Sequence, residues 1–90
     1  MTVHSAQHRI AAALCRLAPD HWEITAMPGM LTAIRLWPDG SVDTVLVLSA
    51  EHTYGRRDDG SNRPVWQTLG SVDEVVRATQ DLTPPGNGSV

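Results

Sequence analysis

The pattern of hydrophobic and polar positions divides the chain into two helical segments on either side of a block of strands. Over residues 5–18 the apolar side chains recur every three or four positions, which is the spacing of one helix face. This segment is expected to be a helix with Ser5 as its N-cap, ended by the turn at Pro19. Its expected buried stripe consists of Ala6, Ile10, Ala13, Leu14 and Leu17.

Three strands are predicted in the middle of the chain. Residues 21–27 alternate between apolar and polar side chains, as a half-buried strand does. Residues 30–37 and 42–50 are apolar at most positions. The Pro-Gly pair at 28–29 predicts a type II turn, and the Pro-Asp-Gly-Ser stretch at 38–41 predicts a tight hairpin.

Two further strands are predicted after the most apolar one. Residues 51–57 can continue as a strand, and residues 63–69 can pair back on them around the turn at Asp59-Gly60. Pro64 is suited to the start of an edge strand, because it cannot donate a hydrogen bond to a central one. Gly70 is expected to end the last strand.

A short second helix is predicted from Val72 to Gln80. Ser71 and Glu74 have the spacing of a capping box, in which each side chain bonds the backbone of the other residue. The expected buried face consists of Val72, Val75 and Val76, with Thr79 at its edge. The order of elements predicts an α+β two-layer sandwich: a meander of three to five antiparallel strands with both helices on one face. Residues 1–82 are expected to form one domain, and residues 83–90 a disordered tail.

Composition and charge restrict the class of partner. All seven basic residues are arginine, a bias typical of GC-rich bacterial genomes, and the net charge is −3. Nucleic-acid binders and proteins of anionic membranes usually carry a basic surface, so neither class of partner is expected. No apolar run approaches the ~18–20 residues that cross a bilayer. The single cysteine, Cys15, cannot form an internal disulfide, which favours a cytoplasmic location.

The order of helix, strands and helix resembles the double-stranded RNA-binding domain. That resemblance implies a lysine-rich cluster at the start of the last helix, where the family holds phosphates beside a shape-led contact with the duplex. The corresponding stretch here, residues 70–76, reads GSVDEVV and is acidic. The similarity is therefore one of topology, and no nucleic-acid partner is predicted.

No catalytic residue, metal site or cofactor is predicted. His4 and His8 share a helical spacing, but nothing in the pattern brings them a third ligand. Cys15 lies on an alanine-rich helix and is expected to be a buried, inert thiol. Asp43 interrupts the most apolar strand and is interpreted as an exposed residue that discourages aggregation.

The stretch around Arg56 and Arg57 is the best candidate for a small polar site. Two guanidinium groups can hold a phosphate or a carboxylate, although the two acids that follow can neutralise them. Both a charged hairpin tip and a loop that recognises a partner remain open as interpretations. His52, Tyr54 and Arg56 alternate onto one strand face, where an anionic ligand could bind.

The two central strands carry more apolar side chains than two helices can cover. A helix is ~10 Å wide, so two of them cover one face of a small sheet. The second face is then covered by the segment 51–69, is closed by the sheet curling on itself, or stays exposed as an interaction patch. The expected interface consists of Leu31, Ala33, Arg35, Trp37, Val45, Val47 and Trp66.

These patterns favour a small non-enzymatic protein-interaction or regulatory module. It is expected to associate with itself as a homodimer, or with a larger protein, through the second sheet face. The alternative is a small-ligand (anion) binding or enzymatic domain that uses the face with His52, Tyr54 and Arg56.

Overall fold

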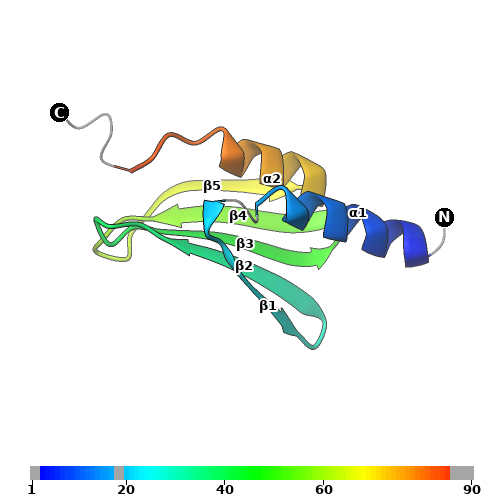
Figure 1. Cartoon of the computed structure of the whole chain (residues 1–90). Coiled ribbons are helices and arrows are strands. Elements are labelled where there is room, and N and C mark those ends of the chain that lie inside the picture. The colour runs from blue at the N-terminus through cyan, green and yellow to red at the C-terminus, as the bar shows by residue number, and fades with distance from the viewer. Residues whose placement is uncertain (1–2, 18–19, 86–90) are drawn as a thin grey trace.

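Five antiparallel strands form one sheet, and two helices lie on one side of it (Figure 1). The computed structural model describes residues 3–17 and 20–85. The elements follow one another as α1 (Val3–Cys15), β1 (Glu23–Met27), β2 (Met30–Leu36), β3 (Val42–Ser49), β4 (His52–Asp58), β5 (Pro64–Gly70) and α2 (Val72–Gln80). The predicted α+β sandwich is confirmed.

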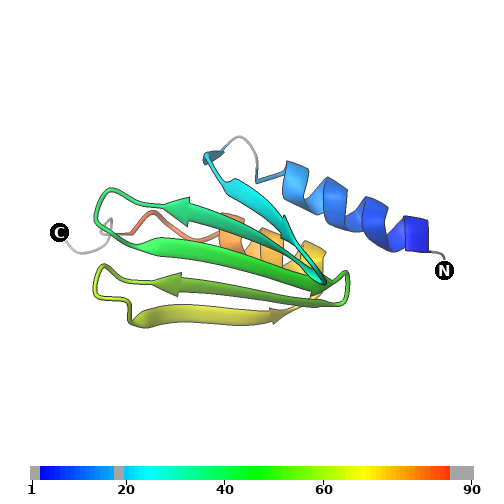
Figure 2. The ribbon, with the colours of Figure 1, turned by 90° about the horizontal axis from the view of Figure 1, so that it is seen from below.

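The sheet is a simple meander in which each strand pairs with the next along the chain (Figure 2). Gly29 has φ +78°, as the second central residue of a type II turn requires, and Gly40 has φ +90° in the next hairpin. Gly60 is needed for a different reason. A Cβ atom there would lie 2.8 Å from the carbonyl oxygen of Asp39, because the two hairpin turns touch.

The start of α2 is fixed by the predicted capping box. The Ser71 hydroxyl accepts a hydrogen bond from the Glu74 backbone N–H, and the Glu74 carboxylate accepts one from the Ser71 N–H. The bonds from Ser71 hold the pKa of Glu74 below its ordinary value. The predicted buried face is also confirmed, since Val72, Val75, Val76 and Thr79 are all buried.

The first helix begins and ends earlier than its apolar pattern predicted. It starts at Val3, so Ser5 lies inside the helix and is not its N-cap. After Cys15 the chain tightens, with backbone bonds from Arg16 to Ala13 and from Leu17 to Leu14. The predicted stripe nevertheless faces the core. Ala13, Leu14 and Leu17 are buried, and Ala6 and Ile10 are partly buried.

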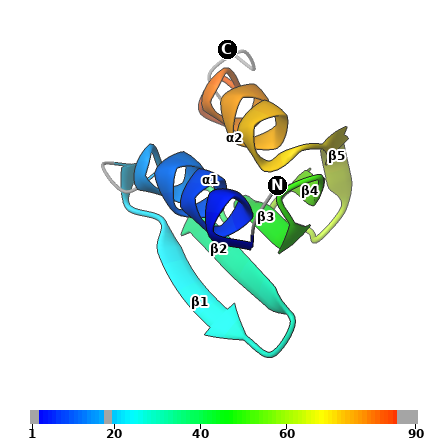
Figure 3. The same cartoon turned by 90° about the vertical axis from the view of Figure 1, so that its right-hand side faces the viewer.

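The expected burial of Cys15 and of the first strand is wrong. Cys15 is exposed on α1. Every residue of β1 is exposed, because β1 lies beyond the helix layer at the border of the sheet (Figure 3). Only Trp22, just before β1, reaches the core.

The core lies between the sheet and the two helices. Gly55 allows α2 to approach β4, because a Cβ atom at Gly55 would lie 2.9 Å from Val75 and 3.3 Å from the Thr79 hydroxyl. Of the predicted tail, residues 86–90 lie outside the described part of the chain, while the Thr83 carbonyl accepts a hydrogen bond from Arg57. No helix within residues 3–17 and 20–85 is long and apolar enough to cross a membrane.

Candidate functional site

Alternation along the strands gives the sheet two different faces. One face, called here the inner face, contacts the helices and carries the buried side chains of the core. The other is called the open face, because no described helix or loop lies over it (Figures 2 and 3). Its apolar residues are Met27, Met30, Ile34, Leu36, Val42, Leu46, Leu48, Tyr54 and Leu69.

The interface expected from the sequence lies on the inner face. Ala33, Val45 and Val47 are buried in the core, and Leu31 packs against it. Arg35, Trp37 and Trp66 belong to the same face and are partly buried. The grouping of these residues on one face was correct, but the helices cover that face, so its assignment as the uncovered one is wrong.

Small residues could have identified the covered face. Ala33 on β2 and Gly55 on β4 both belong to the inner face, where a helix must approach the sheet closely. The open face has a large side chain at most of the corresponding positions. The alternative in which the segment 51–69 covers the second face is wrong, since this segment forms the two predicted strands, β4 and β5, and extends the sheet.

The open face is unusually apolar for a surface. Leu69 is 78% exposed, Leu36 75% and Leu48 59%. Leucines exposed to this degree are ordinary when they are scattered, but these share one side of one sheet. The surplus of apolar residues is therefore real and lies on the side opposite to the one predicted.

The polar groups of the open face bond mainly to one another. The Arg56 guanidinium donates to Asp58 at 2.7 Å, and this carboxylate raises the pKa of Arg56. The Tyr54 hydroxyl donates to the Gln67 side chain at 2.8 Å. His52, Tyr54 and Arg56 do share one face, as predicted, but the last two already have protein partners. An anion would have to compete with Asp58 for the guanidinium.

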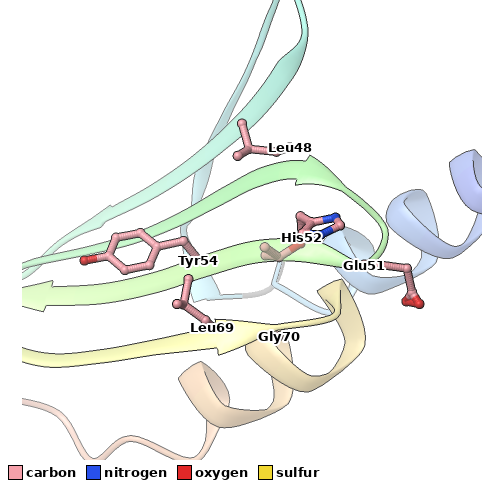
Figure 4. Close-up of a pocket in the computed structure, with 7 residues that line it drawn as sticks. Leu48, Glu51, His52, Tyr54, Leu69 and Gly70 are labelled. Carbon is pink, nitrogen blue, oxygen red and sulfur yellow. The ribbon is translucent and has the colours of Figure 1, made fainter.

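A hollow of about 380 Å³ lies at one end of the open face. Leu48, Tyr54 and Leu69 form its apolar wall, and His52 and Glu51 lie at its rim (Figure 4). The Ser49 hydroxyl accepts a bond from the His52 N–H and lies 3.1 Å from the His52 ring Nδ1. Ser49 thus stabilises the β3–β4 turn beside the hollow. The wall of the hollow is mainly apolar.

A buried ionic cluster on the inner face was missed by the sequence analysis. Asp43 is fully buried, and its two oxygens accept bonds from Arg57 at 2.6 and 3.0 Å. Arg35 donates to it at 3.0 Å, and the Trp37 indole N–H at 2.8 Å. The interpretation of Asp43 as an exposed residue is wrong. Arg57 is also not available to a ligand, because its side chain is only 8% exposed.

The cluster is a row of neighbours in the sheet. Arg35 pairs with Asp43 across β2 and β3, and Asp43 pairs with Arg57 across β3 and β4. The Arg35 guanidinium also lies over the rings of Trp22 and Trp37, at 4.6 and 4.5 Å. Burial opposes ionisation of Asp43, but the bonds from Arg57, Trp37 and Arg35 outweigh it and lower the pKa of this carboxyl.

The geometry of the described residues identifies the candidate site, because neither a metal cluster nor a related protein points to one. Within the described residues, no group of three or more His, Cys, Asp or Glu side chains could hold a metal ion. Comparison of the chain with protein-family models, with curated proteins and with solved structures found no match. Exposure, apolarity and the pairing of Arg56 with Asp58 together favour the open face as the functional surface.

Proposed function

We propose that the chain is a small protein-interaction module whose open face packs against the open face of a second copy. The observation that supports this proposal is the set of exposed leucines gathered on one side of the sheet. Two antiparallel sheets that pack face to face bury such side chains in a layer ~10 Å thick, as β-sandwich cores do. A second copy would supply the layer that this chain lacks.

The size of the open face suits this role. Strands of seven residues are ~23 Å long, and five strands at ~4.8 Å spacing span ~24 Å, so the flat outline is roughly 500 Å². A stable interface buries about 800 Å² of accessible surface on each partner, and protruding side chains give a face more accessible area than its outline.

The charge of the open face also favours a second copy. Two identical faces repel each other when each carries unpaired charge of one sign. Here the positive Arg56 is bonded to the negative Asp58 of the same face, so these two charges cancel within each copy. The positions around them hold neutral side chains, such as Thr44, Leu46 and Gln67. The other acid of the open face, Glu23, lies at the border of the sheet on β1. We place the module in the cytoplasm, where the exposed thiol of Cys15 would stay reduced.

Substitution of Leu48 by aspartate tests the proposal. Leu48→Asp puts two like charges into the proposed interface and should weaken association at least tenfold, which corresponds to ~1.4 kcal/mol. The measurement is molar mass by light scattering across a concentration series, with circular dichroism to verify folding. The control is Ala12→Asp, which adds the same charge at an exposed position of α1 and should leave association unchanged.

Two results would contradict this proposal. One is a wild-type chain that stays monomeric up to hundreds of micromolar. The other is a Leu48→Asp chain with the association constant of the wild type. The alternative, an anion site at His52, Tyr54 and Arg56, predicts instead that phosphate shifts the NMR signals of His52 and Arg56 without changing the molar mass.

A further inference from the structure

The two edges of the sheet are protected to different degrees. β5 begins with Pro64, its pairing with β4 shifts register at Arg57 and Asp58, and α2 packs beside it. Proline, irregular pairing and a covering helix all discourage the addition of another strand. β1 has none of these: its sequence is EITAM, its pairing with β2 is regular, and all its residues are exposed.

The β1–β2 turn determines which backbone groups of β1 point outward. The two-residue turn at Pro28-Gly29 makes Met27 and Met30 the closing, hydrogen-bonded pair. Bonded and non-bonded pairs alternate along an antiparallel ladder, so Thr25 also bonds to β2. Ile24 and Ala26 belong to the intervening pairs, and their N–H and C=O groups are directed at the free edge.

We propose that β1 pairs with β1 of a second copy, antiparallel about a two-fold axis at Thr25. Ile24 then lies opposite Ala26 of the second copy, and each such pair exchanges two backbone hydrogen bonds. Thr25 lies opposite Thr25 of the second copy, in the close, non-bonded type of pair that favours threonine contacts. The pairing also covers Ile24, which is 42% exposed in the single chain.

The charges of β1 fit this register. Glu23 is the one charged residue of the strand, and the two-fold axis places it opposite Met27 of the second copy. The two glutamates are then offset by four positions, or ~13 Å along the strands, which exceeds the ~8 Å screening length at physiological salt. A parallel arrangement in register would instead bring the two carboxylates side by side.

This edge pairing goes beyond the proposed function, because it uses a different surface. A two-fold axis perpendicular to the sheet joins the two sheets into one continuous sheet and leaves both open faces on the same side. Face-to-face packing needs a second two-fold axis in the plane of the sheet. The two axes are perpendicular, so where they also intersect they generate a closed tetramer with dihedral symmetry.

Disulfide trapping tests the register. In a Cys15→Ser background, Thr25→Cys should form a covalent dimer with oxidised glutathione, because Cα atoms of a non-bonded pair are ~4.5 Å apart, within the ~4.4–6.8 Å range of disulfides. The matched controls are Glu23→Cys and Met27→Cys. Each should crosslink poorly alone, but a mixture of the two should give a mixed dimer, since these positions face each other.

A Thr25→Cys chain that does not crosslink, or a Glu23→Cys chain that crosslinks by itself as fast as Thr25→Cys does, would overturn the proposal.

A proline substitution tests the outward backbone donor. Ala26→Pro removes an N–H group that does not bond to β2, so the chain should fold and lose edge association by light scattering. Ala26→Val keeps the donor and should associate like the wild type. If Ala26→Pro fails to fold, the crosslinking pattern still tests whether β1 pairs with β1 of a second copy. Adding Leu48→Asp to Thr25→Cys separates the two proposals, since the trapped dimer should persist even where open-face packing is lost.

Discussion

The variant Val47→Asp is expected to be unfolded in the absence of denaturant. Val47 is buried in a core cluster of apolar side chains, which offers an aspartate no compensating charge. Loss of the buried side chain costs about 1.5–3 kcal/mol, and burial of an unpaired charge adds several more. The sum is comparable with the ~5–15 kcal/mol by which small domains are stable. Circular dichroism and urea titration measure the effect.

The neighbouring residue provides the control for this prediction. Leu48→Asp makes the same change one position along β3, where the side chain is exposed on the open face. It should remain folded, with a urea midpoint close to that of the wild type when association is absent. Two adjacent identical substitutions with opposite effects would establish which face the helices cover. Equal stability of the two variants would show that the inner and open faces are wrongly assigned.

The variant Asp43→Ala is expected to lose about 3–5 kcal/mol of stability, the cost of removing one member of a buried ion pair. The carboxylate holds Arg57 through two bonds and Arg35 through one, and both largely buried guanidinium groups would lose this counter-ion. The control Glu23→Ala removes an exposed acid from β1 and should change the unfolding free energy little. A loss below about 1 kcal/mol would mean that water reaches the arginines and that the cluster contributes little.

The same carboxylate should make the protein sensitive to acid. The hydrogen bonds from its three donors lower the pKa of Asp43 below its ordinary value. A lowered pKa in the folded state gives stability that is complete above the unfolded-state value of ~3.9 and is lost as pH falls through the folded-state value. Wild-type stability should therefore decrease below about pH 4, and Asp43→Asn should lack this part of the decrease. Urea midpoints measured from neutral to acid pH test the prediction.

Local patterns predicted most of the fold because each element carries its own signal. The capping residues Ser71 and Glu74 begin α2, and Pro28 and Gly29 make the first turn. Alternation correctly separated Val45 and Val47 from Leu46 and Leu48. In each case the interacting groups are close in sequence, so residue type and spacing are sufficient.

Local patterns could not predict which face of the sheet the helices cover, nor could they predict the ionic cluster. Periodicity separates two faces but does not say on which one distant helices pack, and both faces of β2 and β3 are apolar. The bonds of Asp43 to Arg35 and Arg57 depend on the pairing of three strands. Considered alone, an aspartate in an apolar strand suggests exposure, and only its tertiary partners make burial favourable.

The row formed by Arg35, Asp43 and Arg57 has a consequence for how the strands find their alignment. Strands that are apolar on both sides lose little hydrophobic contact when one slides past its neighbour by a single residue. In this sheet such a slip would move the Asp43 carboxylate to the open face and leave two largely buried guanidinium groups without their counter-ion. The bonds of the charged row can form in only one alignment of the strands. The row therefore specifies a single register, which the surrounding valines and leucines alone would not.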